Sequence, residues 1–227
     1  MQFALNDKGD IIHASYADKS QQYFCPICNK NVIPRKGETN IDHFSHITKC
    51  DDHWNYAMSK WHSEWQEIFP EKNREVVIEH NNIKHRADIM AYGYVIEFQH
   101  SNITAKEFDE RNKFFISCGK KVIWIFDLID EYKSGRIDPY ESTKNGDKYS
   151  WKYPKRFLQS YSPQYNKDIF VFFQFSKSKH SDIENSYIER IVWAIHEDGL
   201  SNFSRFATSY DPGNAYELFQ WIKYHKL

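Results

Sequence analysis

The middle of the chain carries the clearest pattern of hydrophobic and polar positions. Apolar residues recur at helical spacing in two segments, and shorter apolar or alternating runs beside them are typical of strands. A strand, a crossover helix and a buried strand form a parallel pair, so we expect a mixed α/β (α+β) fold with the order α-β-β-β-α-β. The predicted elements are a helix at 54–69, strands at 75–80, 85–92 and 94–99, a helix at 105–117 and a strand at 121–127.

The segments on either side of this core differ from it in pattern. Residues 1–52 begin with a predicted hairpin that turns at 6–9 and continue with short elements around clustered cysteines and histidines. Residues 131–157 are polar, with glycine, proline and aromatics, and predict an irregular excursion. Strands at 168–175 and 187–196 and a helix at 214–226 follow. We therefore expect a small N-terminal module (1–52), a core (53–130) and a C-terminal extension packed on the core (131–227).

Composition places the chain among folded proteins without a dominant charge. Of the 227 residues, 41% are hydrophobic and 27% are charged, which excludes an intrinsically disordered chain. The formal net charge is −1, so a binding site for a polyanion has to be a local patch. The first residues lack the basic and apolar regions of a signal peptide, and no apolar run approaches the ~18 residues of a membrane span. We expect a cytoplasmic protein with no membrane association.

Cysteine and histidine residues with the spacing of metal ligands cluster in the N-terminal module. Cys25 and Cys28 are separated by two residues and form a knuckle that offers two thiolates to one tetrahedral zinc ion. His43 is the simplest third ligand, and either His46 or Cys50 is the fourth. The alternative is a set of small buried thiols with surface histidines. Because a segment with so little apolar core usually needs a metal to fold, the sequence favours a structural zinc site.

An acidic pattern lies on two neighbouring predicted strands of the core. Asp88 belongs to the first strand, and Glu97 and Gln99 share one face of the second, because side chains alternate along a strand. A carboxylate in so apolar a run is costly to desolvate unless a metal ion or an ion pair compensates it. The ion pair would use Arg86 or Lys84. Of these two interpretations, we favour the metal site.

The order of elements, with an acid on the second strand and Glu-x-Gln on the third, resembles the PD-(D/E)xK nuclease superfamily. From Cys25 to about Asp127 the chain resembles the competence protein CoiA family, through the motifs CPIC, HFSH, RADI, IEFQHS and KKVIWIF in that order. The resemblance implies a restriction-endonuclease-like core in which Asp88 and Glu97 hold Mg²⁺ or Mn²⁺. It also implies that Gln99, two residues after the glutamate, positions the attacking water.

The same resemblance gives the first helix a catalytic role, and here the chain departs from the family pattern. His62 matches the family's helical histidine, whereas Gln66 stands at the position of a lysine and Met58 at that of a frequent acid. The three residues share one helical face at spacings of four, so this face has lost charges that family members commonly carry. We expect His62 to be catalytic and Gln66 to lie beside it, close to the substrate.

Three further residues are candidates for contacts around this site. His100 and Ser101 follow the Glu97 strand at its C-terminal end, where open α/β sheets commonly bind ligands. Arg111 lies on the second predicted helix and either meets a phosphate group or extends its charged head into solvent as surface arginines commonly do.

A run of lysines and an arginine at 144–156 is interleaved with Tyr149, Trp151 and Tyr153. Cations that alternate with aromatic rings suit a single-stranded nucleic acid, which takes phosphate contacts and stacking surfaces together. The alternative is a loop pinned by its aromatics with the lysines in solvent. We favour this alternative.

Together these features predict a DNA-processing protein that hydrolyses phosphodiester bonds with Mg²⁺ or Mn²⁺ and is stabilised by zinc. The resemblance suggests DNA uptake, recombination or defence as its context, with DNA, single- or double-stranded, and recombination or defence proteins as partners. An alternative from another class is a DNA-binding protein that keeps the nuclease fold with weak or no catalysis. A zinc-dependent interaction protein is a third option, but it would not explain the presence of Asp88 and Glu97.

Overall fold

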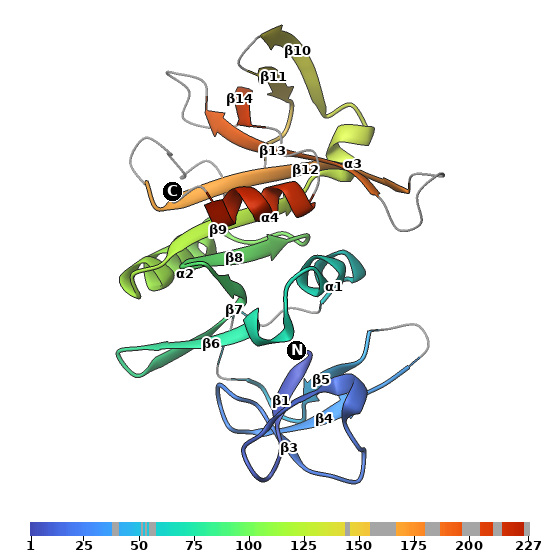
Figure 1. Ribbon diagram of the computed structural model, residues 1–227, viewed down its shortest axis with the longest axis vertical. Helices are drawn as coiled ribbons and strands as arrows, with labels where there is room; N and C mark the ends of the chain where they lie inside the picture. The colour runs from blue at the N-terminus through green and yellow to red at the C-terminus, as the bar shows by residue number, and fades with distance from the viewer. Residues whose placement is uncertain are drawn as a thin grey trace. The chain divides into compact units, whose positions relative to one another are not determined.

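The chain divides into two compact units, residues 1–90 and residues 91–227. Both contain sheets and few helices, which agrees with the expected α+β class (Figure 1). The computed structural model describes residues 1–37, 41–50, 52, 54, 58–143, 146–154, 167–179, 187–196, 205–210 and 215–224.

The first unit begins with an antiparallel sheet of five short strands in the order β2-β1-β3-β4-β5. The predicted hairpin at 6–9 is present, because Asn6 Oδ1 accepts hydrogen bonds from the backbone N–H of Lys8 and Asp10, and Gly9 adopts a φ of 85°. The short helix η1, Ala14–Tyr16, follows the second strand. The strands are β1 (Phe3–Leu5), β2 (Ile11–His13), β3 (Tyr23–Phe24), β4 (Asn31–Arg35) and β5 (His43–His46).

This N-terminal sheet has only a small hydrophobic core. Tyr23 and Phe44 are the large side chains in it, with ring centroids 5.0 Å apart, and Cys25 is fully buried beside them. The other buried members are mostly small residues such as Ala4. A core of this size contributes little apolar burial, so the module depends on additional links within it.

The rest of the first unit consists of α1 (Lys60–Glu67), the short helix η2 (Glu71–Asn73) and the antiparallel strands β6 (Arg74–His80) and β7 (Ile83–Ala91). The predicted helix at 54–69 is therefore too long. Ser59 is the reason, because its hydroxyl accepts a hydrogen bond from the backbone N–H of His62 and starts the helix at Lys60. Part of the remainder, 55–57, lies outside the described residues.

The second unit is built on a sheet in which seven strands follow one another in the order β8-β9-β12-β13-β14-β11-β10. Strands β8, β9 and β12 are parallel to one another, and the predicted crossover helix α2 connects the first two. Thr104 caps α2 as predicted, since its hydroxyl accepts from the backbone N–H of Glu107 at 3.1 Å. The elements are β8 (Tyr94–Gln99), α2 (Ala105–Ser117), β9 (Lys121–Asp127), α3 (Ile129–Lys133), β10 (Ile137–Thr143), β11 (Gly146–Trp151), β12 (Ile169–Lys179), β13 (Tyr187–His196), β14 (Arg205–Tyr210) and α4 (Ala215–Tyr224).

Helices α2 and α4 cover opposite faces of this sheet (Figure 1). Phe108 of α2 packs on Trp124 of β9, with ring centroids 4.8 Å apart, whereas Trp221 of α4 packs on Phe172 of β12 at 5.6 Å. Phe172 lies in register with Ile125, the neighbour of Trp124, so the two aromatic contacts are on different faces. Among the helices in the described part of the chain, none is long and apolar enough to cross a membrane.

The prediction of an irregular excursion at 131–157 was wrong. Strands β10 and β11 form an antiparallel hairpin there, and β11 pairs in turn with β14. Tyr149 and Trp151 are almost fully buried against Phe173 and Phe175 of β12. The pair Asn145-Gly146, a common hairpin-turn dipeptide, was the sequence signal that could have revealed the hairpin.

The aromatic core gives a direct test of this arrangement. Phe173 is fully buried and contacts rings of β9, β11 and β14, so Phe173→Ala should lower the free energy of unfolding by about 3–5 kcal/mol. Tyr153, which is 77% exposed, is the matched control, and Tyr153→Ala should change stability by less than about 0.5 kcal/mol. Urea denaturation measures both, and equal effects would contradict the sheet order.

Candidate functional sites

The first candidate site is a cluster of three cysteines and one histidine in the N-terminal sheet. Its first half is a tight turn in which the backbone N–H of Asn29 donates to the carbonyl of Cys25 at 2.9 Å. Asn29 closes the turn with a φ of 55°, a conformation that asparagine tolerates better than most residues. The N–H of Ile27 donates to Cys25 Sγ at 3.4 Å, so the turn orients this sulfur toward Cys28.

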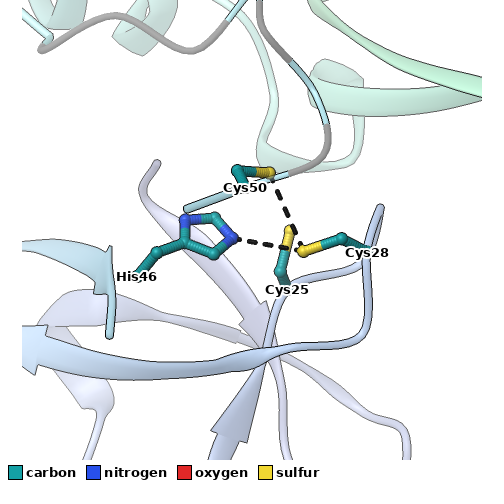
Figure 2. Close-up of side chains that lie close together, drawn as sticks. All are labelled: Cys25, Cys28, His46 and Cys50. Atoms are coloured by element: carbon teal, nitrogen blue, oxygen red, sulfur yellow. Dashed lines mark hydrogen bonds between the residues drawn. The ribbon is translucent and has the colours of Figure 1, made fainter. Parts of the chain in front are cut away.

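Distances within the cluster match a tetrahedral zinc site. Cys28 Sγ lies 3.4 Å from His46 Nε2 and 3.7 Å from Cys50 Sγ, and the four ligand atoms all lie within 4.8 Å of one another (Figure 2). Zn–S bonds of about 2.3 Å and Zn–N bonds of about 2.0 Å separate tetrahedral ligands by about 3.6–3.8 Å. The set Cys25, Cys28, His46 and Cys50, hereafter the Cys/His cluster, could therefore hold a metal such as zinc.

The structure corrects the predicted ligand set. The sequence favoured His43 as the third ligand and left His46 and Cys50 as alternatives for the fourth, whereas the Cys/His cluster contains the latter two and not His43. Side chains alternate along β5, so His46 shares a face with the buried Phe44 and His43 shares the opposite face with Ser45. His43 Nδ1 instead bonds the carbonyl of Ile41 at 2.8 Å.

The surroundings of the Cys25 and Cys50 thiols raise their pKa values and so favour a bound cation. Burial raises the pKa of Cys50 to about 12, and the neighbouring thiols of Cys25 and Cys28 add to the rise. Burial is also the main cause of the raised pKa of Cys25. The protein around these sulfurs thus opposes thiolate formation, and a bound cation would compensate the charge that the ligands must carry.

Zinc content tests the revised ligand set. Protein purified without added zinc should contain about one equivalent of the metal, and His46→Ala should lose most of it because a tetrahedral site would lack its only nitrogen ligand. His43→Ala is the matched control on the opposite face of the same strand and should keep the metal. Inductively coupled plasma mass spectrometry gives the content. Loss of zinc from His43→Ala but not from His46→Ala would restore the original assignment.

A buried carboxylate fastens the N-terminal sheet to the rest of the first unit. Glu75 of β6 is almost fully buried and accepts hydrogen bonds from the backbone N–H of Gln2, at 2.9 Å to each oxygen, and of Phe3 at 3.3 Å. Burial alone would raise the pKa of Glu75, but the Arg86 guanidinium and these backbone donors outweigh it and lower the pKa. Glu75 adopts a φ of 47°, a strained value for this residue type that such contacts must offset.

Arg86 of β7 connects Glu75 to two further acids. Burial opposes the charge of Arg86, yet its pKa is raised because the carboxylates of Glu75, Asp52 and Asp88 lie close to it. Asp52 is also within 3.1 Å of His85 Nδ1, and Trp54 stacks on the His85 ring at 3.4 Å between centroids. Asp52 stands two residues after Cys50, so the charged contacts around Arg86 begin close in sequence to the Cys/His cluster and reach Asp88.

The lowered pKa of Glu75 predicts a loss of stability in acid. A carboxylate whose pKa is lower in the folded chain stabilises it above the unfolded value, near 4.5, and this contribution disappears as the pH falls through the folded value. Glu75→Gln should cost about 3 kcal/mol at pH 7 and less as the pH falls below about 4.5. The exposed Glu79→Gln of the same strand is the control, with a change under about 0.5 kcal/mol. Chemical denaturation at several pH values measures both, and a Glu75→Gln cost that is independent of pH would contradict the ion-pair assignment.

Two of the expected catalytic residues meet in the first unit. His62 Nε2 of α1 lies 3.1 Å from Asp88 Oδ1 of β7, and both side chains are 18% exposed. Gln66, one helical turn after His62, donates its amide to the backbone carbonyl of Asp88 at 3.3 Å. The face of α1 that carries His62 and Gln66 therefore packs on Asp88, and Arg86 lies beside this carboxylate.

Glu97 lies in the second unit with an ionic partner of its own. Its side chain is only 1% exposed, and Arg111 Nη1 of α2 lies 2.6 Å from Oε2. Arg111 also bonds Glu107 Oε1 through Nε at 3.0 Å and Nη2 at 2.8 Å. Arg111, for which the sequence left a phosphate group and solvent as alternatives, instead contacts two carboxylates. The ion-pair alternative named Arg86 or Lys84. Arg86 does lie beside Asp88, whereas the cation beside Glu97 is Arg111. The spacing of four between Glu107 and Arg111 is a sequence signal only for the ion pair within α2.

Side chains at the C-terminal end of β8 have defined local partners. Gln99, which is almost fully buried, donates to the backbone carbonyl of Ser101 at 2.6 Å. His100 Nδ1 lies 2.8 Å from Asp127 Oδ2, at the end of the neighbouring parallel strand β9. Asp127 is a residue that the sequence reasoning missed, and only the register of the parallel pair places it beside His100.

Comparison with models of known protein families shows which family the chain matches. Two models match: Competence protein CoiA, N-terminal domain, over residues 7–52, and Competence protein CoiA, nuclease-like domain, over residues 63–190. The second match alone covers more than half of the chain. The chain belongs to the competence protein CoiA family. No curated protein and no solved structure matches the chain.

Both CoiA matches coincide with the sites described above. The CoiA N-terminal match contains the whole Cys/His cluster, and the CoiA nuclease-like match contains Asp88, Glu97 and Gln99. His62 lies one position before the nuclease-like match begins. The family assignment therefore supports a nuclease-like domain joined to an N-terminal module that could hold a metal.

Proposed function

We propose that this CoiA-family protein is a metal-dependent deoxyribonuclease that hydrolyses phosphodiester bonds in DNA uptake, recombination or defence. The observation that carries the proposal is the match to the CoiA nuclease-like domain over 63–190, which includes both acids of the expected site. We propose DNA, single- or double-stranded, as the substrate, recombination or defence proteins as partners, and the cytoplasm as the location. The core would have the restriction-endonuclease-like order.

Asp88 and Glu97 would hold the catalytic Mg²⁺ or Mn²⁺. Their oxygen donors suit these hard cations, which bind few protein carboxylates and keep several waters. When bound, the cation would supply activation of a water and neutralisation of charge on the phosphate.

The remaining residues would position these acids and the water. His62 would hold Asp88 through the 3.1 Å contact, and Arg111 would fix the rotamer of Glu97. The amide nitrogen of Gln99 donates a hydrogen bond to the backbone carbonyl of Ser101. The amide oxygen of Gln99 would then accept a hydrogen bond from the attacking water. Gln99 brings no positive charge, so the cation would carry most of the phosphate stabilisation.

Two observations favour the alternative, a DNA-binding protein that keeps the nuclease fold without efficient catalysis. The buried Glu97 already has a cation beside it in Arg111, so its charge is compensated without a metal ion. The face of α1 toward Asp88 also presents Gln66 in place of a lysine. Both features would weaken metal binding or catalysis without disturbing the fold.

Cleavage assays separate the two functions. Asp88→Asn and Glu97→Gln should each lower Mg²⁺- or Mn²⁺-dependent cleavage of DNA by at least about 100-fold, because each removes an anionic oxygen ligand. Glu110→Gln on α2 is the matched control, since its carboxylate pairs with the exposed Lys106, and it should cleave at the wild-type rate. Cleavage of labelled single- and double-stranded oligonucleotides is followed at matched salt, with EDTA as the blank.

Metal binding is measured alongside as the shift of the thermal midpoint on adding Mg²⁺. Wild-type protein should be stabilised by Mg²⁺, and neither acid variant should be. Because each acid already has a cationic neighbour, both variants should be less stable than wild type in EDTA, so the metal-induced shift is the informative quantity. A wild type that binds DNA but cleaves neither substrate would establish the binding protein instead.

A further inference from the structure

The N-terminal module contains a pocket that the nuclease-like domain does not explain. Its volume is about 590 Å³, within the range of ligand-binding clefts. We call it the basic pocket; the residues that line it are Lys19, Gln21, Ile33, Pro34, Arg35, Lys36, Gly37, His43 and Ser45.

The basic pocket is built on the face of β4 and β5 opposite to the Cys/His cluster. Ile33 pairs in register with Ser45, and Arg35 with His43, so these four side chains share one face of the strand pair. His46, the cluster's histidine, belongs to the other face of β5. One short strand thus contributes a metal ligand to one side and a pocket wall to the other.

The pocket concentrates positive charge in a chain whose net charge is −1. Lys19, Arg35 and Lys36 are exposed cations, and none of the nine lining residues that the structure describes is an acid. Lys36 Nζ donates to the backbone carbonyl of Ser15 at 2.8 Å, which holds this ammonium group in place. A local cationic surface of this kind attracts a polyanion even though the whole chain is nearly neutral.

Other groups in the pocket suit a nucleotide chain more than a small anion. Gln21 and Ser45 offer neutral hydrogen-bonding groups, and the half-buried Ile33 offers apolar surface to a sugar or base. His43 Nδ1 bonds the Ile41 carbonyl and therefore carries the proton of the neutral ring, so Nε2 is the ring nitrogen left for a ligand. A single phosphate ion would use only part of such a lining.

We propose that the basic pocket binds the phosphodiester backbone of DNA and holds the strand on the N-terminal module. The proposal rests on the proposed function in one respect, that DNA is the substrate class. The run at 144–156 is a weaker candidate for this role. Its Tyr149 and Trp151 are almost fully buried and have no ring face for a base, and Lys148 lies 2.7 Å from Glu141.

Binding at different salt concentrations tests the pocket. The full-length double variant Lys19→Gln/Arg35→Gln should bind fluorescein-labelled DNA at least about tenfold more weakly at low salt. The slope of log Kd against log salt concentration should decrease by about 1.4 for single strands or 1.8 for duplex, the loss expected from two phosphate contacts. Both substrates are titrated in EDTA by fluorescence anisotropy, so that cleavage does not interfere.

A second double variant controls for general electrostatic attraction. Lys8→Gln/Lys72→Gln removes the same charge from exposed positions of the first unit outside the pocket. It should keep the wild-type salt slope, and Arg35→Lys should keep most of the affinity. Equal losses from the two double variants would overturn the proposal, because binding would then depend on charge alone. Unchanged zinc content and thermal midpoints establish that the variants are folded.

Hydrogen exchange shows where on the protein the DNA binds. Addition of DNA should slow amide exchange in the peptides of β4 and β5, and a lack of protection there overturns the proposal whatever the affinities are. The acid variant Asp88→Asn should bind DNA through the pocket like wild type. A protein that binds here without cleaving contradicts only the nuclease proposal, and a protein that cleaves with an unprotected pocket contradicts only the present one.

Discussion

The first unit depends on one set of charged contacts, in which carboxylates compensate the positive charge of the buried Arg86 guanidinium. A charged group withdrawn from water is costly unless acids surround it, and Glu75, Asp52 and Asp88 do so from three separate segments. Glu75 also binds the backbone of the first strand, so the N-terminal sheet, β6 and β7 are joined by a single set of charges. The position of Asp88, the proposed metal ligand, follows from this arrangement as much as from the strand that carries it.

By holding a metal ion, the Cys/His cluster could give the N-terminal module stability that its small hydrophobic core does not provide. The raised pKa values of Cys25 and Cys50 and the ligand distances near those of tetrahedral zinc are compatible with a bound metal such as zinc. The cluster also brings His46 of β5 and Cys50 to the turn that carries Cys25 and Cys28. The opposite face of the same strands presents the cations of the basic pocket. Under the proposal above, one module of about fifty residues would serve both stability and DNA binding.

In the second unit, the proposed metal ligand Glu97 has surroundings that differ from those of Asp88. Glu97 lies between a parallel sheet and α2, and Arg111 neutralises it together with Glu107. This arrangement holds the carboxylate in one rotamer, which suits a metal ligand, but it also removes the electrostatic need for a metal. The proposed nuclease activity therefore depends on the balance between Arg111 and the metal cation at one carboxylate.

The sequence by itself determined the elements whose signals are local. The hairpin at 6–9, the cap at Thr104, the parallel strands about α2 and the pair of cysteines in CPIC follow from turn, capping and periodicity rules that involve neighbouring residues. Tertiary structure decided the rest. The exclusion of His43 from the Cys/His cluster depends on which face of β5 turns inward, and the pairing of Glu97 with Arg111 depends on how α2 packs on the sheet, because both join residues that only folding brings together.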